Sequence, residues 1–288
     1  MNQHLPSGFV IDAMTEKEAR ILDEWAAKEG WNPGLNDIAV AWTFDPAAFI
    51  ALRRGNELIG GGCTISYHGA AGFMGLFIVQ TEYRRQGLGT ILWHERLKRL
   101  KARVRPDAPI GMDGVFEMVP FYTRGGFALM HRDLRYEGVA AGEPDPAAAP
   151  LDSIEFLKID NYDCLHVETR RTEFLRSWLT QPGGRGLALI DNEQLTGYGF
   201  IRPCRTGYKV GPAFADDAAC GKRLIHSLLS LVAGERVLMD IPEPNEAALR
   251  IVEGLGWNQS FGCARMVNGP KPALPVQRIF GVTSFEFG

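Results

Sequence analysis

The 288-residue chain lacks the features of several broad protein classes. It has no basic excess, because 31 Lys and Arg residues oppose 34 Asp and Glu residues, for a formal net charge of -3. That balance argues against a general nucleic-acid or anionic-membrane binder, so any anion site must be local. No apolar run approaches the roughly 18 residues needed to cross a bilayer. The start, MNQHLPSGFVIDAM, has no basic head before an apolar core, so no signal peptide is expected.

Cysteine is scarce, odd in number and never arranged as a CxxC pair. Such spacing indicates buried thiols in a reducing compartment and excludes an obvious zinc site or disulfide framework. We therefore expect a cytoplasmic protein that holds no metal. The five residues are Cys63, Cys164, Cys204, Cys220 and Cys263.

The composition is that of a globular protein with room for more than one domain. Hydrophobic residues make up 45% of the chain and charged residues 23%, enough for one large domain or two of average size. One segment near the midpoint, GVAAGEPDPAAAPLDS, combines Pro, Gly, Ala and acids without periodicity. The sequence thus predicts a first domain over residues 1–137, a linker over 138–153 and a second domain over 154–288.

The two halves share one order of predicted elements. The first half reads strand, helix, three strands, helix, strand, short helical piece and strand, and its first helix begins at a capping-box pair, Thr15 and Glu18. The strand over 72–79, GFMGLFIV, is apolar on both faces and is predicted to be central. The second half repeats this order less clearly, with a closing strand predicted over 278–288. The chain therefore resembles two copies of one domain.

The segment YRRQGLGTILWHERL, which begins at Tyr83, predicts an anion site. A helix N-terminus carries about half a positive charge and several unpaired N–H groups. Gly87 and Gly89 let a phosphate reach those groups, and Arg84 and Arg85 add full charges, which suits a pyrophosphate. No Gly-Lys-Ser/Thr follows, as a Walker loop requires, and the third glycine of a dinucleotide fingerprint is absent. A glycine-capped helix with solvated arginines is the alternative.

These residues resemble a known family. RRQGLG after FIVQTEY is similar to the Arg/Gln-x-x-Gly-x-Gly/Ala acyl-CoA motif of the GNAT superfamily of N-acetyltransferases, and FYTRGGF is similar to its Tyr-x-x-x-Gly-Phe ending. The double copy resembles the tandem subgroup, in which a motif-bearing domain is joined to a degenerate one. The resemblance implies an α/β (α+β) fold with two GNAT-like domains, each a mixed, mostly antiparallel central sheet flanked by helices. It also implies acetyl transfer from acetyl-CoA to a primary amine of a small molecule, in a ternary complex on a monomer or homodimer.

The same resemblance implies which residues bind coenzyme A. The glycine loop would hold the pyrophosphate, and the backbone of the preceding strand would pair with the extended amides of the pantetheine arm as with an added strand. A backbone N–H in that strand, near residues 78–79, would polarise the thioester carbonyl. The implied cofactor residues are Phe77, Ile78, Val79, Arg84, Arg85, Gln86, Gly87, Leu88, Gly89 and Thr90.

Acyl transfer also needs a base and an acid, because an alkylamine with a pKa of roughly 10.4 is protonated at pH 7. Tyr122 matches the position that in many GNAT enzymes protonates the leaving thiolate; the alternative is a packed tyrosine. Asp113, at the end of the strand after the cofactor helix, is predicted to be the base or a substrate ligand, or else a strand-end cap. Glu117 is a second base candidate or a solvated acid. The sequence departs from the superfamily pattern at Val115, where the superfamily often has an Asn that contacts the cofactor.

Other residues are predicted to line the acceptor pocket. Trp31, Asp37, Trp42 and Tyr67 fall where this fold places that pocket; for each aromatic the alternative is a residue of the core. Arg202, from the second half, could close the pocket across the interface or form a surface ion pair.

The second half is predicted to be catalytically inert. Its corresponding loop, VGPAFADDAACGKRLI, lacks the arginine pair and the Gly-x-Gly, and Asp216 and Asp217 would repel a pyrophosphate. Val252 stands at the tyrosine position. Two alternatives to the acetyltransferase stay open: a tandem acyltransferase with a bulkier donor, and a non-catalytic acyl-CoA-binding sensor. A catalytic role for Tyr122 would distinguish the enzymes from the sensor.

Overall fold

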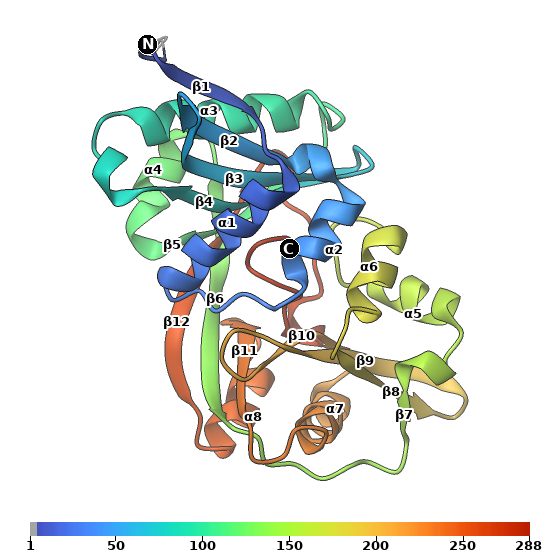
Figure 1. Ribbon diagram of the computed structural model, residues 1–288. Coiled ribbons are helices and arrows are strands. Elements are labelled where there is room, and N and C mark those ends of the chain that lie inside the picture. Colours follow the sequence, from blue (N-terminus) through green and yellow to red (C-terminus); the bar gives the residue numbers. More distant parts are fainter. Residues whose placement is uncertain (1–4) are drawn as a thin grey trace.

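A computed structural model describes residues 5–288, through which one 13-stranded sheet runs (Figure 1). The strand order is β1-β2-β3-β4-β5-β12-β6-β11-β10-β9-β8-β7, and β13 pairs with β10 beside this path. Among the described strands, the pairs β4–β5 and β10–β11 are parallel and the others are antiparallel. The predicted class, a mostly antiparallel sheet flanked by helices, is therefore confirmed, with the two predicted sheets joined into one.

The first half supplies six strands and four α-helices. The strands are β1 (Phe9–Ala13), β2 (Phe49–Arg54), β3 (Glu57–Tyr67), β4 (Ala71–Val79), β5 (Ile110–Val115) and β6 (Ala128–Val139). The helices are α1 (Glu16–Lys28), α2 (Asp37–Phe44), α3 (Leu88–Lys101) and α4 (Val119–Arg124), with short 3-10 turns η1 (Pro46–Ala48), η2 (Thr81–Tyr83) and η3 (Phe116–Met118).

The second half repeats this order and adds one short strand. Its strands are β7 (Ala148–Pro150), β8 (Arg185–Asp191), β9 (Gln194–Pro203), β10 (Tyr208–Ala215), β11 (Arg236–Pro242), β12 (Asn258–Asn268) and β13 (Ile279–Gly281). Its helices are α5 (Phe156–Asp163), α6 (Thr172–Leu179), α7 (Ala218–Ser230) and α8 (Glu246–Gly254), with 3-10 turns η4 (Leu151–Ser153) and η5 (Val276–Arg278).

The two halves exchange their long last strands. Strand β6 leaves the first half and pairs with β11 of the second, while β12 returns from the second half and pairs with β5 of the first. The two exchanged strands pair with each other antiparallel, from Ala128 with Val267 to Glu137 with Asn258. They lie side by side and span both halves in Figure 1. Each half of the sheet is thus completed by a strand from the other.

Several local predictions agree with the structure and others do not. The capping box is present, with the Thr15 and Glu18 side chains each bonded to the other residue's backbone N–H. The closing strand predicted over 278–288 is wrong except for β13, because β12 is the long last strand. Helices α2 and α5 were not predicted. The segment 138–153 contains β7 and η4, and the proposed domain boundaries stay a prediction.

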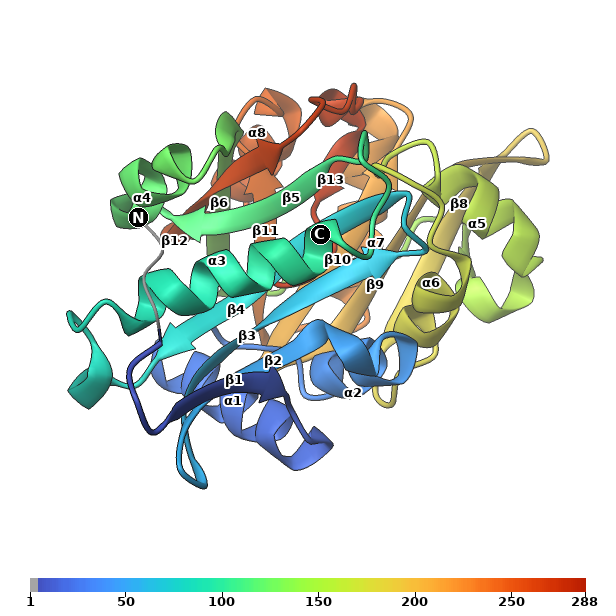
Figure 2. The same ribbon diagram turned by 90° about the horizontal axis from the view of Figure 1, so that it is seen from above.

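The helices cover both faces of the sheet, and one core is shared by both halves. In Figure 2, α3 lies across one face of the first-half strands and α1 and α2 lie on the other. The largest apolar cluster joins residues of α1 and α2 to residues of α5, α6, β9 and β10. It also includes Phe285 and Phe287, so the 282–288 segment is part of the core. Among residues 5–288, no helix is long and apolar enough to cross a membrane, and no group of His, Cys, Asp and Glu is arranged to hold a metal ion.

Candidate active site

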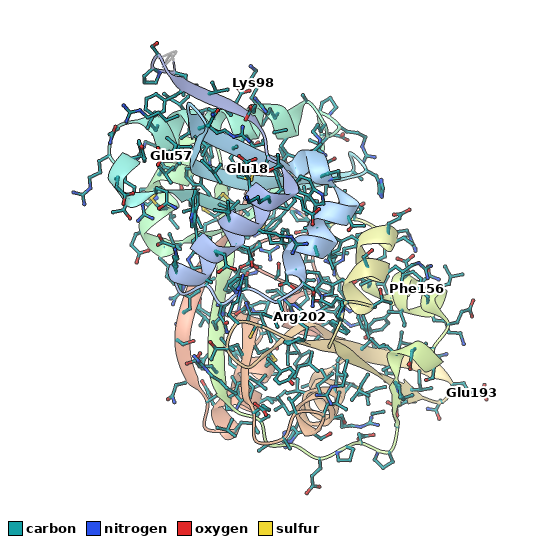
Figure 3. All side chains as sticks on the ribbon, in the orientation of Figure 1. Glu18, Glu57, Lys98, Phe156, Glu193 and Arg202 are labelled. Atoms are coloured by element: carbon teal, nitrogen blue, oxygen red, sulfur yellow. The ribbon has the colours of Figure 1, made fainter. Side chains whose placement is uncertain are left out.

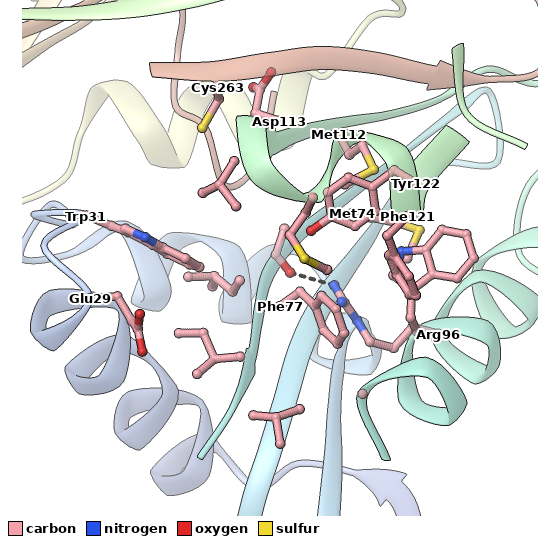
Figure 4. A pocket seen from close by; sticks show the side chains of 18 of the residues that line it. Glu29, Trp31, Met74, Phe77, Arg96, Met112, Asp113, Phe121, Tyr122 and Cys263 are labelled. Atoms are coloured by element: carbon pink, nitrogen blue, oxygen red, sulfur yellow. Dashed lines mark hydrogen bonds between the residues drawn. The ribbon is translucent and has the colours of Figure 1, made fainter. Parts of the chain in front are cut away.

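A cavity of about 490 Å³ lies in the first half, where β4 and β5 separate beside α3 and α4 (Figure 4). Its volume is in the range usual for small-molecule sites. Most of its wall comes from the first half, including the loop before α3, but residues of β12 and of the 282–288 segment complete it. The cavity is therefore built by both halves of the chain.

One end of the cavity is formed by the arginine-glycine loop. Gly87, with a left-handed φ of 80°, is the N-cap of α3, and no side chain of the described residues caps this helix. Arg84 is fixed because its Nε donates to the Val79 carbonyl oxygen at 2.7 Å and its Nη2 donates to Glu29. Arg85 is exposed beside it. The loop thus presents free N–H groups and cations together, which is an arrangement suited to phosphate.

The free edge of β4 forms the floor of the cavity. This strand pairs with β5 only between residues 72–74 and 110–112, and beyond Met74 no described strand covers that edge. Leu76 has a φ of 53°, and the register of β4 against β3 shifts in this stretch. Backbone groups on this edge are therefore available to an extended ligand, and the pairing of the edge with pantetheine stays a prediction.

Eight of the ten predicted cofactor residues line the cavity. Gln86 does not, and its side chain donates to the Glu82 carbonyl oxygen at 2.8 Å. Leu88 is buried in an apolar cluster between α3 and the sheet. The contact of all ten with a cofactor stays a prediction. The eight are Phe77, Ile78, Val79, Arg84, Arg85, Gly87, Gly89 and Thr90.

Tyr122 lies on α4 with its hydroxyl group pointing into the cavity (Figure 4). Its ring packs near Trp93 and Phe121, and Gly114 has no side chain where one would overlap the ring. The residue is only 5% exposed. Burial raises the pKa of Tyr122 to about 12, so the phenol keeps its proton at neutral pH.

Arg96 is a cavity residue that the sequence reasoning missed. It is 1% exposed, and its Nη2 donates to the carbonyl oxygens of Cys63 at 2.7 Å and Gly75 at 2.5 Å. Burial lowers its pKa to about 10, so the guanidinium is still charged at pH 7. The sequence did contain a signal for it. Arg96 stands three positions after Trp93, on the apolar face of the helix, where a charged residue is unusual.

Asp113 lines the cavity but is held in a buried ion cluster. Its Oδ1 accepts from Arg265 Nε at 2.8 Å, and the carboxylate points toward β12 in Figure 4. Burial, and secondarily the neighbouring Asp133, raise its pKa well above the usual range against the effect of Arg265. The role of Asp113 as base or substrate ligand stays a prediction. The contact that the structure shows is the ion pair with Arg265, which joins β5 to β12. Glu117, the second base candidate, is exposed and does not line the cavity.

Of the predicted acceptor residues, Trp31 lines the cavity. Asp37 and Arg202 lie outside the cavity wall and form a buried two-bond ion pair, with distances of 2.7 and 2.9 Å, between α2 and β9. In Figure 3 Arg202 is at the centre of the molecule, between the halves. The arginine was therefore correctly placed at the interface, while its role in acceptor binding stays a prediction.

Trp42 and Tyr67 also lie outside the cavity wall. Trp42 packs on Phe49, with ring centroids 5.4 Å apart. The Tyr67 hydroxyl donates to the Phe287 carbonyl oxygen at 2.6 Å and so fixes the 282–288 segment. Their predicted contact with the acceptor is likewise untested, and the structure shows core packing for both.

The second half differs at the two positions that correspond to the open end and the free edge of this cavity. Asp217 is the N-cap of α7, and its carboxylate accepts from the Cys220 N–H at 2.9 Å, so the chain's own acid occupies the anion position. Strand β13 pairs with β10 at Ala213 and Phe214, where the corresponding edge of β4 is free. The edge of β10 that corresponds to the free edge of β4 is thus covered by another strand of the protein.

Comparisons with known proteins agree with this geometry. The family profile described as the acetyltransferase (GNAT) family matches residues 14–127, and the one described as the acetyltransferase (GNAT) domain matches residues 159–281. A holothin acyltransferase from a Pseudoalteromonas species is 24% identical over 279 residues, covering 94% of this chain and 92% of the relative.

Solved structures show the same fold. A structure from Pyrococcus horikoshii, provisionally assigned as an acetyltransferase, superposes with a TM-score of 0.82 at 19% identity, covering 100% of this chain and 99% of the other. A tandem GNAT protein from the clavulanic acid biosynthesis pathway superposes with a TM-score of 0.63 at 14% identity, covering 91% and 99%. At these identities the likeness concerns the fold.

Proposed function

Because the chain belongs to the GNAT family of acetyltransferases, with a family domain in each half, we propose that this acyltransferase moves an acetyl group from acetyl-CoA to a primary amine of a small molecule. The acceptor attacks directly in a ternary complex, and each chain binds one cofactor. The observation that carries the proposal is that one cavity joins the uncapped N-terminus of α3, the free edge of β4 and the hydroxyl of Tyr122, which points into it.

The cavity supports a specific orientation of the cofactor. The pyrophosphate fits against the first N–H groups of α3, which no side chain caps, and against the arginines of the loop, because both are positive. Arg85 is exposed there, while Arg84 also pairs with Glu29. The pantetheine arm fits along β4 as an added strand, in the way that β13 pairs with β10 in the second half. The thioester then lies near Tyr122 and Arg96, at the point where β4 and β5 separate.

The residues there suit acyl transfer. The amine nitrogen bonds to the carbonyl carbon, the carbon–sulfur bond breaks, and Tyr122 donates its proton to the departing thiolate. The buried cation of Arg96 favours negative charge in the cavity while the thiolate forms. Two protons leave the ammonium group of the acceptor: one replaces the proton of Tyr122 and the other goes to a base.

A bulkier acyl donor is a second candidate. The relative from Pseudoalteromonas is described as an acyltransferase acting on holothin, with no acyl chain specified, and the cavity wall here is largely apolar. A larger acyl group would occupy the same end of the cavity as the acceptor.

Thiol release from acetyl-CoA, measured across a panel of primary amines, tests the proposal. We expect turnover with at least one amine, and calorimetric titration with coenzyme A should give one site per chain. Longer acyl-CoA donors in the same assay separate the two candidates. Absence of coenzyme A binding would contradict both, and binding without turnover of any amine would favour the sensor.

A further inference from the structure

Glu286 is the one carboxylate on the wall of the cavity that residues 5–288 leave without an ion pair. Three acidic side chains line the cavity, of which Glu29 pairs with Arg84 and Asp113 pairs with Arg265. Glu286 is 5% exposed, and its Oε2 is buried without a hydrogen-bond partner. We infer that Glu286 binds the ammonium group of the acceptor and takes its proton, so that the acceptors are primary alkylamines with an apolar body. This inference rests on the proposed function and deepens it.

The 282–288 segment places Glu286 firmly. The Ser284 hydroxyl accepts the N–H groups of Glu286 at 3.1 Å and of the next residue at 3.0 Å. Arg171 donates to Thr283 at 2.9 Å and to the Gly288 carbonyl oxygen at 3.0 Å. A buried side chain on a segment held in this way is preorganised for binding.

The segment also touches the strand that is proposed to hold the cofactor. The Glu286 carbonyl oxygen lies against Gly75 of β4, where any larger residue would overlap it. This contact is one residue before Leu76, at the point where the edge of β4 becomes free. Glu286 is therefore beside the expected thioester position, as a base for the attacking nitrogen must be.

The surroundings of Glu286 suit a ligand that carries an ammonium group on an apolar skeleton. Phe285, Phe261 and Trp31 supply aromatic wall in the same cavity. Glu286 also interacts electrostatically with the buried cations Lys209, Arg135 and Arg202. Lys209 has no hydrogen-bond partner among the described residues.

Lys209 is a buried cation near Glu286. The other reading is that Glu286 only balances the charge of Lys209. No ion pair joins the two within 4.0 Å in the described chain, and Oε2 of Glu286 has no hydrogen-bond partner there.

The step balances in protons. An alkylammonium ion carries one proton too many to attack a carbonyl, and Glu286 accepts that proton before the nitrogen–carbon bond forms. When the carbon–sulfur bond breaks, the thiolate takes the proton of Tyr122, which is restored by the second proton leaving the nitrogen. Glu286 then passes its proton to water, and N-alkylacetamide and coenzyme A are the products.

Binding of a matched ligand pair tests the inference without turnover. Benzylamine is cationic at pH 7, and benzyl alcohol has nearly the same shape without charge. Calorimetry on the protein, with and without coenzyme A, should show that wild type binds benzylamine at least about tenfold more tightly than the alcohol. Glu286→Gln should remove that preference and leave the affinity for benzyl alcohol and for coenzyme A unchanged.

Two further variants keep the result interpretable. Glu193→Gln makes the same change at an exposed carboxylate between β8 and β9, off the cavity wall, and should keep the wild-type preference. If Glu286→Gln fails to fold, Glu286→Asp, which keeps the charge, should retain a preference for benzylamine. A wild type that prefers neither ligand, or a Glu286→Gln protein that still prefers the amine, would overturn the inference, even if acetyl transfer to other amines is observed.

Turnover separates proton removal from a structural role. With acetyl-CoA and benzylamine, Glu286→Gln should lose about 10²–10⁴-fold in kcat/KM. With aniline, which is neutral at pH 7, the loss should stay within about threefold because no proton must leave before attack. Equal losses on both acceptors would overturn the assignment of Glu286 as base. If wild type releases no thiol with any amine, the proposed function fails, and the binding measurement alone decides on Glu286.

Discussion

Burial affects both partners in the proposed proton transfer to the leaving thiolate. Tyr122 has a pKa of about 12 because it is buried, which by itself makes it a weak acid toward a thiolate with an ordinary thiol pKa of about 8.5. The same cavity wall holds Cys263, whose thiol pKa burial also raises well above its usual range. A thiolate released there is equally desolvated and becomes a stronger base. The difference between the pKa of the Tyr122 phenol and the pKa of the coenzyme A thiol is therefore smaller in the cavity than the raised pKa of Tyr122 alone would indicate.

Replacing Tyr122 by Phe tests this proton donor, because the substitution removes only the hydroxyl group. The ring and its packing stay, so affinity for acetyl-CoA should remain within about threefold of wild type. Loss of the acid should lower kcat by about 10²–10⁴-fold. Tyr208→Phe, which removes a phenol from β10 in the second half, is the control and should change neither value. If Tyr122→Phe turns over within about threefold of wild type, Tyr122 is a packing residue.

At the scale of elements, the two equivalent helices α3 and α7 differ at their N-termini. The first begins with Gly87 and has no side-chain cap, while the second begins with Asp217, whose carboxylate accepts a backbone N–H. That hydrogen bond is the largest cause lowering the pKa of Asp217, so the acid is ionised at neutral pH and occupies the positive end of its helix. One helix is therefore left open to an external anion and the other is closed.

Replacing Gly87 at the start of α3 by Asp, the residue that begins α7, should abolish coenzyme A binding. In Gly87→Asp the carboxylate would stand where the pyrophosphate is proposed to bind, so coenzyme A affinity measured by calorimetry should fall by at least about 10²-fold. Gly87 has a φ of 80° and open space around it, so part of any effect is backbone strain. Gly234→Asp is a matched control, with a φ of 83° and equally open surroundings in the second half. Equal coenzyme A affinity in the two variants would contradict the phosphate assignment.

At the scale of the whole molecule, the exchanged strands make the halves interdependent. Separating them would break the β5–β12 and β6–β11 pairings. It would also expose buried ion pairs that join the halves, such as Asp37 with Arg202 and Arg135 with Asp240. Because these contacts form together, we expect unfolding to be a single cooperative transition.

Asp37→Ala tests the energetic link between the halves. Arg202 is 0% exposed and would be left as a buried charge without its partner, which costs about 3–5 kcal/mol of unfolding free energy. Urea denaturation measures this loss. Glu16→Ala, which breaks an exposed pair with Arg20, should cost less than about 1 kcal/mol. A change at Asp37 as small as that at Glu16 would mean that the ion pair does not stabilise the junction.

Local sequence predicted those parts of the fold and site that depend on neighbouring residues. The capping box of α1, the uncapped glycine start of α3 and the Tyr122 position before Gly126 and Phe127 are all set by spacings of a few residues. Hydrophobic periodicity located most strands and the helices that pack on them. It missed α2, whose eight residues are apolar on nearly every side and so show little periodicity.

The family, the repeated order of elements and the loop proposed to hold a pyrophosphate could all be predicted, because each depends on contiguous residues. The exchange of strands between the halves, the ion pair of Asp113 with Arg265 and the position of Glu286 at a cavity built mainly by the first half became known from the folded chain. Strand pairing between distant segments depends on which edges and buried charges meet after the chain has packed. Such long-range choices leave no periodic pattern in the segments that make them.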